Sequence, residues 1–292
     1  MRADPADYCY FSPGNLIEAL GLLAKDPAQW LPIAGGTDVM VQYSAGKLVY
    51  RNLMNIWNIP ELRNIEVSPE EIRIGAACTY TELRKHEIVS REFELLSRAA
   101  AWTGGIANQN RGTLGGNIAN ASPGADSLPA LLVYGAELTL ISERGARRVA
   151  YADFHHGYKK TALAGDELIR EITLPRRFSE YFAHARKVGA RNAQAISKVC
   201  LAALGQLVDG KVHDVRIALG SIAPVPLRLY ETENAVRGRQ MDGFLIEAAR
   251  KVVTKEIQPI DDIRSTARYR AEVAGNLVEE FLEKLMAGES SA

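Results

Sequence analysis

The chain has little that would tie it to a membrane, to nucleic acid or to an oxidising compartment. Its 35 Lys and Arg residues balance 35 Asp and Glu residues, so net charge favours neither nucleic acid nor an anionic membrane surface. No run of about 18 apolar residues is present, which argues against a membrane-spanning helix and direct membrane insertion. Because residues 1–7 lack the apolar stretch of a secretory signal, we expect a cytoplasmic protein. A complex that is exported by the signal sequence of a partner subunit would be compatible with the same sequence.

Groups that bind metals or attack substrates are also scarce. Cys9, Cys78 and Cys200 form no C-x-x-C pair, and we expect three small buried side chains. An iron–sulfur cluster held by this chain alone would need four thiolates. His155 and His156 are adjacent, so on a strand they point to opposite sides and cannot readily share one metal. We expect a structural or surface role for both.

Two short glycine-rich stretches are the most informative features present. They are IAGGTDV at 33–39 and TLGGN at 113–117. Paired glycines let the backbone turn sharply and approach a ligand closely, because no Cβ stands in the way. Neither stretch fits the G-x-G-x-x-G fingerprint or the P-loop. One such stretch alone could be an ordinary turn or a bulge, but two in one chain predict a cradle around a pyrophosphate.

Length and pattern predict an α+β fold with more than one structural unit. The 292 residues, 47% of them hydrophobic, suffice for two domains or for one large domain with an appendage. Residues 10–57 read as alternating helices and strands, with the first helix expected to begin at Ser12-Pro13. The first glycine stretch lies between a strand and a helix that Thr37-Asp38 would cap. The second lies in a polar stretch, 103–127, that we expect to be irregular.

A linker at 176–180 should precede a second part of different character. Strand-like runs follow, and Asp209-Gly210 between two of them predicts a hairpin. From about residue 229 the chain reads as helices. The last, at 265–287, carries an apolar stripe that predicts a core face or a subunit contact: Val273, Leu277, Val278, Phe281, Leu282 and Leu285.

Three groups of motifs resemble those of one known family. They are AGGTD at 34–38, TLGGN at 113–117 followed by NASP and Asp126, and RKVGAR at 186–191 followed by ISKV. Their order and intervals resemble those of the FAD-binding medium subunit of molybdenum hydroxylases, the family of xanthine dehydrogenase and carbon monoxide dehydrogenase. The likeness covers residues 8–285.

The resemblance implies an α+β architecture in two domains. Residues 1–177 would form a two-lobed FAD-binding domain of the p-cresol methylhydroxylase (PCMH) and vanillyl-alcohol-oxidase type, with lobes at about 1–57 and 58–177. Residues 178–292 would form a C-terminal domain of antiparallel sheet plus helix bundle, like that of the CO dehydrogenase flavoprotein.

The resemblance also implies which residues hold FAD. The first glycine stretch would surround the pyrophosphate, mainly through backbone N–H groups, and the second would close on it from the other lobe. Asp126 would contact hydroxyl groups of the cofactor, the backbone of Ile169 its flavin or adenine portion, and Lys187 the isoalloxazine ring. The implied set is Leu31, Pro32, Ile33, Ala34, Gly35, Gly36, Thr37, Asp38, Val39, Thr103, Thr113, Leu114, Gly115, Gly116, Asn117, Asp126, Ile169 and Lys187.

Some of these residues have other interpretations when taken alone. Asp126 would ordinarily be the N-cap of a helix at 127–134, and it could serve both purposes. Lys187 on an alternating strand would ordinarily be a solvated side chain. Thr103 stands where relatives often have a larger apolar residue. Gln194 lies in a loop that can carry an acidic residue near the flavin and nicotinamide sites of relatives, so its neutrality argues against NAD as acceptor.

The function that the resemblance implies is electron transfer in an oxidoreductase. This subunit would take electrons from [2Fe–2S] clusters of a small partner subunit to FAD and pass them to an external acceptor. A large partner subunit with molybdopterin would transform the substrate, in a dimer of heterotrimers. The sequence shows no nucleophile or paired carboxylates of its own, which agrees with a relay. The alternatives are a free-standing PCMH-type flavin oxidase or reductase, and a scaffold subunit without cofactor.

Overall fold

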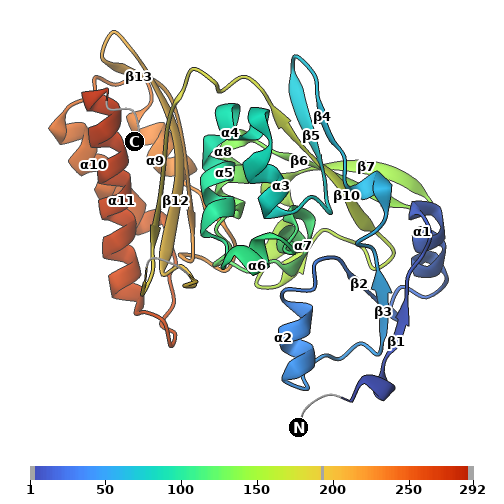
Figure 1. Ribbon diagram of the computed structural model, residues 1–292. Coiled ribbons are helices and arrows are strands. Elements are labelled where there is room, and N and C mark those ends of the chain that lie inside the picture. Colours follow the sequence, from blue (N-terminus) through green and yellow to red (C-terminus); the bar gives the residue numbers. More distant parts are fainter. Residues whose placement is uncertain (1–3, 192–193, 289–292) are drawn as a thin grey trace.

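The structure is a computed structural model that describes residues 4–191 and 194–288. Within these residues the strands form three sheets and a two-stranded ribbon, and the sheets follow one another in chain order (Figure 1). We refer to the three sheets with their helices as the first, second and third units.

The first unit is a small parallel sheet of order β1-β3-β2. Its strands are joined by two helices, and the elements in chain order are β1 (Cys9–Phe11), α1 (Leu16–Lys25), β2 (Trp30–Ile33), α2 (Val39–Ser44) and β3 (Asn52–Asn55). Because parallel strands need a crossover connection, the chain between β2 and β3 must leave the sheet. The first glycine stretch lies in that connection, directly after β2.

The second unit is an antiparallel sheet of order β4-β5-β10-β6-β7 with a layer of short helices. Its strands are β4 (Ile65–Val67), β5 (Glu71–Gly75), β6 (Glu137–Ser142), β7 (Gly145–Ala150) and β10 (Leu168–Pro175). Its helices are α3 (Tyr80–Lys85), α4 (Glu87–Glu92), α5 (Glu94–Trp102), α6 (Ile106–Gln109), α7 (Leu114–Asn120) and α8 (Leu128–Tyr134). Between β7 and β10 the chain forms the ribbon of β8 (His155–Gly157) and β9 (Lys160–Thr161).

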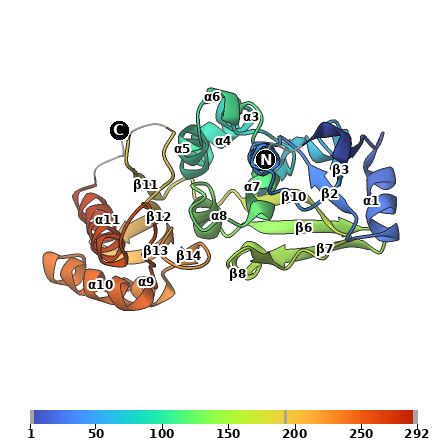
Figure 2. The same cartoon turned by 90° about the horizontal axis from the view of Figure 1, so that it is seen from below.

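The third unit is an antiparallel sheet of order β11-β12-β13-β14 covered by helices on one face (Figure 2). Its elements are β11 (Phe182–Val188), β12 (Val199–Val208), β13 (Lys211–Gly220), β14 (Leu227–Arg228), α9 (Tyr230–Val236), α10 (Gly243–Glu256) and α11 (Ala267–Ala287). The predicted Asp209-Gly210 hairpin joins β12 to β13, and both residues have the positive φ that such a turn needs.

The apolar stripe of α11 belongs to the core of the third unit. Five of its six side chains are buried against β12 and α10: Leu277, Val278, Phe281, Leu282 and Leu285. The prediction of a core face is therefore confirmed. No helix in the described ranges is long and apolar enough to cross a membrane.

The second and third units share one apolar core. Three cross-strand neighbours of the third sheet, Ala185, Ala202 and Ala218, are buried in the same cluster as the side chains of α5 and α8. Their small side chains allow the helices to lie close to the sheet, and α8 contacts both β12 and β13. The sheet is thus packed on both faces.

Three expectations about local structure were wrong. Asp38 stands at the N-cap position of α2, but its side chain makes no capping hydrogen bond there. The first helix starts after Asn15, whose side chain accepts from the N–H of Glu18, rather than at Ser12-Pro13. The stretch 103–127 is not irregular, because it contains α6 and α7. Both helices are short and have weak sequence signals. Hydrogen bonds to residues distant in sequence, Ala76 and Cys78, hold the start of α7 in place.

The contact between the first and second units leaves no room for a side chain at Gly35. A Cβ built on Gly35 would lie 1.6 Å from the carbonyl oxygen of Arg111. The Arg111 guanidinium lies over the Trp57 ring, 4.0 Å from its centroid, and its Nε is 3.5 Å from the Gly35 oxygen. The two glycine stretches are held near each other by this approach.

We expect Gly35→Ala to destabilise the protein by about 1–3 kcal/mol, because the methyl group must push two backbone segments apart. Thermal unfolding measures the effect, with Gly243→Ala as the control. A Cβ on Gly243 meets nothing within 4 Å at the start of α10, so that change should cost nothing. Equal stability of the two variants would contradict the close approach.

Candidate functional site

The first glycine stretch presents a row of open backbone donors. It follows β2, turns at Gly36 with φ of +73° and leads into α2. Within the described part of the chain, the N–H groups of residues 34–38 donate to no protein acceptor. A run of unpaired N–H groups at a turn is a ready site for an anion.

The second glycine stretch is built differently, because most of its donors are already used. Thr113 caps α7 by accepting from the N–H of Gly116 at 3.1 Å. The N–H groups of Leu114 and Gly115 donate to the carbonyls of Cys78 and Ala76, at 3.0 and 2.8 Å. These bonds fix the start of α7 against the end of β5.

The two glycines of this stretch have different reasons to lack a side chain. A Cβ on Gly115 would lie 2.5 Å from the Cβ of Ala76, so Gly115 is required by packing inside the protein. A Cβ on Gly116 would approach only the Thr113 hydroxyl, at 2.8 Å. Gly116 therefore keeps open the side of α7 that does not face the protein core.

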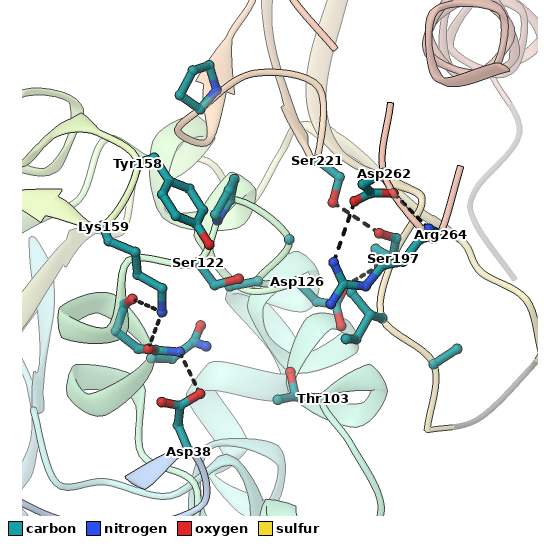
Figure 3. A pocket seen from close by; sticks show the side chains of 18 of the residues that line it. Asp38, Thr103, Ser122, Asp126, Tyr158, Lys159, Ser197, Ser221, Asp262 and Arg264 are labelled. Atoms are coloured by element: carbon teal, nitrogen blue, oxygen red, sulfur yellow. Dashed lines mark hydrogen bonds and ion pairs between the residues drawn. The ribbon is translucent and has the colours of Figure 1, made fainter. Parts of the chain in front are cut away.

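A chain of polar contacts links all the segments around these stretches. Lys159, in the turn between β8 and β9, donates to the backbone and side-chain oxygens of Asn120 at 2.8 and 2.6 Å. Asn120 donates in turn to the Asp38 carboxylate at 3.4 Å. Figure 3 shows Asp38 and Lys159 near each other, and Asn120 connects them, so that the three side chains link α2, α7 and the ribbon.

A cavity of about 880 Å³ opens beside this chain of contacts, between the second and third units. Figure 3 shows Asp38, Tyr158 and Lys159 on one side, Ser197, Ser221 and Asp262 on the other, and Thr103 and Asp126 between them. Its size is within the range typical of small-molecule and cofactor sites, and its walls come from segments far apart in the sequence.

Asp126 lines the cavity at its floor and belongs to a buried ion pair with Lys187. The Lys187 Nζ donates to Asp126 Oδ2 at 2.6 Å and to the Trp102 carbonyl at 3.0 Å, and the Ser197 hydroxyl donates to Asp126 Oδ1. The side chains of Asp126 and Lys187 are only 8% and 11% exposed. Burial raises the pKa of Asp126, while the Lys187 ammonium and the Ser197 hydroxyl oppose that shift.

Asp126 does not cap the following helix, which was the interpretation of this residue taken alone. Ser127 occupies the N-cap position of α8, and no side-chain capping bond is present there. Both oxygens of the Asp126 carboxylate instead accept hydrogen bonds from Lys187 and Ser197.

Comparison with known proteins identifies the family of the chain. A model of the FAD binding domain in molybdopterin dehydrogenase matches residues 6–177. A model of the CO dehydrogenase flavoprotein C-terminal domain matches residues 184–285. The chain belongs to the FAD-binding medium subunits of the molybdenum hydroxylase family.

Individual relatives match over almost their whole length. The xanthine dehydrogenase FAD-binding subunit of Escherichia coli O157:H7 is 32% identical over 95% of this chain and 96% of its own. The glyceraldehyde dehydrogenase medium chain of Sulfolobus acidocaldarius is 28% identical over 92% and 95%. A solved carbon monoxide dehydrogenase of Hydrogenophaga pseudoflava, which lacks the Mo-pyranopterin moiety of its cofactor, gives a TM-score of 0.92 at 28% identity, over 96% of this chain and 97% of that one. The expected α+β fold and family are thus confirmed.

The structure places several of the predicted cofactor residues of this FAD-binding subunit in four different settings. Four of them line the cavity: Asp38, Thr103, Asn117 and Asp126. Lys187 contacts the floor through Asp126. Three apolar residues in and just before the first glycine stretch instead pack in a small cluster with Leu48 and Leu53: Leu31, Ile33 and Val39. Ile169 is buried in β10 and pairs with Leu140 of β6, away from the cavity lining.

Sequence reasoning missed the wall that the third unit contributes. Arg270 is 4% exposed, and its guanidinium donates to the Ser221 carbonyl and to Asp262 Oδ1, both at 2.7 Å. The Ser221 hydroxyl donates to the Ser197 carbonyl at 3.1 Å. No motif marks these residues, because the wall depends on contacts between segments far apart in sequence, such as that of Arg270 with Ser221, 49 residues earlier.

The cysteines and His155 have structural surroundings, but one expectation about the cysteines was wrong. Cys78 and Cys200 are buried, and burial raises the pKa of the Cys78 thiol to about 12, but Cys9 is exposed against expectation. The His155 ring packs against Tyr151 and Phe154, and burial lowers its pKa to about 4. Among the described residues, no group of three His, Cys, Asp or Glu side chains could hold a metal ion.

We expect Lys187→Met to lower the free energy of unfolding by about 3–5 kcal/mol near neutral pH, since it leaves Asp126 buried and charged without its partner. The folded pKa of Asp126 is already raised, and loss of the ammonium raises it further. Stability of the variant should therefore fall as the pH rises above about 4, and its deficit should shrink as the pH falls.

Urea unfolding across this pH range measures the effect. The double variant Asp126→Asn/Lys187→Met should lose this pH dependence, and Lys251→Met, at an exposed lysine of α10, should behave like the parent protein. A deficit in Lys187→Met that does not change with pH would show that the Asp126 charge is not its cause.

Proposed function

We propose that this chain binds FAD in the cavity and passes electrons through it within a larger molybdenum hydroxylase. The observation that carries the proposal is the row of open N–H groups at residues 34–38, which lies beside a cavity that ends in a buried Asp126–Lys187 pair. The first feature suits a pyrophosphate, and the second suits the polar groups of a flavin nucleotide.

The pyrophosphate would lie against the first glycine stretch. Residues 34–38 would donate their N–H groups, and Leu31, Pro32, Ile33 and Val39 would hold the loop in shape by packing. From the other side, Thr113, Gly116 and Asn117 would approach the same group. Leu114 and Gly115 would act by fixing α7, because their own N–H groups are already engaged.

The remaining predicted residues would orient the rest of the cofactor. Thr103 and Asp126 border the cavity, and Asp126 would accept from hydroxyl groups of the ligand. Lys187 would bring a positive charge to the flavin ring, where a partly desolvated site strengthens its effect. Ile169 would contribute through its backbone, since its side chain is buried in the core.

FAD, when bound, supplies the redox chemistry and allows electrons to be received singly and given up in pairs. The protein would position it, exclude water from the floor and keep one positive charge nearby. We further propose partners in the form of a small [2Fe–2S] subunit and a large molybdopterin subunit, assembled in the cytoplasm as a dimer of heterotrimers. The relatives' names, which include a medium chain and a FAD-binding subunit, support a multi-subunit assembly.

We expect Gly116→Val to weaken FAD binding at least 100-fold, because the side chain would fill the space through which the ligand reaches α7. Titration of the apoprotein with FAD, followed by flavin fluorescence, measures the affinity. Gly243→Val is the matched control, since Gly243 also lies in the first turn of a helix and has open space around it. Stoichiometric FAD in a folded Gly116→Val protein would refute the cradle.

Purification of the native assembly tests the role in a complex. We expect two further polypeptides to accompany this chain, together with flavin, iron and molybdenum, as seen by mass spectrometry, metal analysis and the visible spectrum. A single yellow polypeptide would indicate a free-standing flavin enzyme instead. A complex without flavin would indicate a scaffold subunit.

A further inference from the structure

A second hollow lies on the far side of Lys187, along the outer edge of the third sheet. β11 is the end strand of that sheet and pairs only with β12 among the described strands. Residues 184–191 line a groove of about 680 Å³, with Arg98 and Trp102 of α5 on one wall and Lys284 of α11 on the other. Figure 2 shows β11 between these two helices. We call this hollow the β11 groove.

The β11 groove is strongly cationic. Five of the eleven described residues that line it are Lys or Arg, and none is Asp or Glu: Arg98, Arg186, Lys187, Arg191 and Lys284. Glu94 pairs with Arg98 and Asp126 with Lys187, both from outside the lining. A single carboxylate, Glu280, is shared by Arg186, Lys284 and the ring of His184. The groove therefore keeps a positive excess.

One buried polar side chain that lines the groove has no hydrogen-bond partner. The side chain of His184 is 3% exposed, and its ring lies nearly parallel to those of Phe182 and Phe281, with centroids 6.4 and 6.5 Å away. Neither ring nitrogen makes a hydrogen bond in the described structure, and Nε2 stays 3.4 Å from the Glu280 carboxylate. Buried polar groups nearly always make hydrogen bonds, so a ligand that enters the groove would supply the hydrogen-bond partner that the His184 ring lacks.

The strand edge and the charge point to the same kind of ligand. The outer edge of an end strand offers backbone N–H and C=O groups to another extended chain. Isolated charges can protect such an edge, but a concave groove with one sign of charge attracts the opposite sign instead. A small anion would neutralise the positive charge of the groove but would not form hydrogen bonds with the backbone groups on the outer edge of β11.

We propose that the β11 groove receives an acidic, extended segment of another protein as an additional strand beside β11. Carboxylates of that segment face Arg186 and Lys284, and one side chain reaches His184. The inference depends on the proposed function only for the source of the segment, a partner subunit of the complex. Binding of the segment itself does not require FAD.

The test uses the full chain and a fluorescein-labelled ten-residue peptide of alternating Glu and Thr. We expect a fluorescence anisotropy titration to show saturable binding, weakened at least tenfold by Arg186→Glu/Lys284→Glu. The matched control Lys251→Glu/Lys255→Glu makes the same charge change on exposed α10 and should bind like the parent protein. Circular dichroism confirms that both variants fold.

Two further probes separate strand addition from attraction of charge alone. The same peptide with N-methyl groups on alternate backbone nitrogens should bind at least tenfold more weakly, and hydrogen exchange of β11 amides should slow only with the unmethylated peptide. Equal binding of both peptides, full displacement by 10 mM inorganic phosphate, or no saturable binding would each overturn the proposal. Flavin content, measured on the same samples, reports separately on the proposed function.

Discussion

The buried ion pair between Asp126 and Lys187 is the interaction on which the site depends. Asp126 precedes α8 of the second unit, and Lys187 belongs to β11 of the third, so the pair joins two units across the cavity floor. Two buried charges are tolerated only when their hydrogen bonds are well satisfied. Trp102 and Ser197 supply these bonds, and in doing so they bring the end of α5 and the start of β12 to the same place.

The two glycine stretches show how one residue type can serve two physical needs. Gly35 and Gly115 are required because protein backbone or side chain already fills the space where a Cβ would lie. Gly36 provides a positive φ, and Gly116 leaves one face of α7 open. Packing inside the protein thus fixes the positions of the two glycine stretches, and the face around Gly116 is left open for a ligand. A sequence motif shows that glycine is present, but only the structure shows which need each glycine meets.

Local signals predicted the elements whose structure is determined locally. The Asp209-Gly210 turn and the apolar spacing of α11 both depend on residues close in sequence, and both were predicted. The start of α7 was not, because its N–H groups are satisfied by Ala76 and Cys78, which are almost 40 residues earlier. The wall formed by Arg270 and Ser221 has the same origin in long-range contacts. Motifs at family spacing pointed to Asp126 and Lys187, which composition and periodicity alone would have assigned to a helix cap and a solvated side chain.

Lys187 stands between the cavity and the β11 groove, and this position has a physical consequence. Its ammonium is held at the cavity floor by Asp126, while its residue forms part of the strand edge that lines the groove. An acidic segment placed beside β11 would add negative charge on one side of the ammonium while the cavity lies on the other. Since the side chain is nearly buried, water would screen this effect only weakly. Occupancy of the groove and the electrostatic potential in the cavity are therefore coupled through one residue, without any movement of the fold.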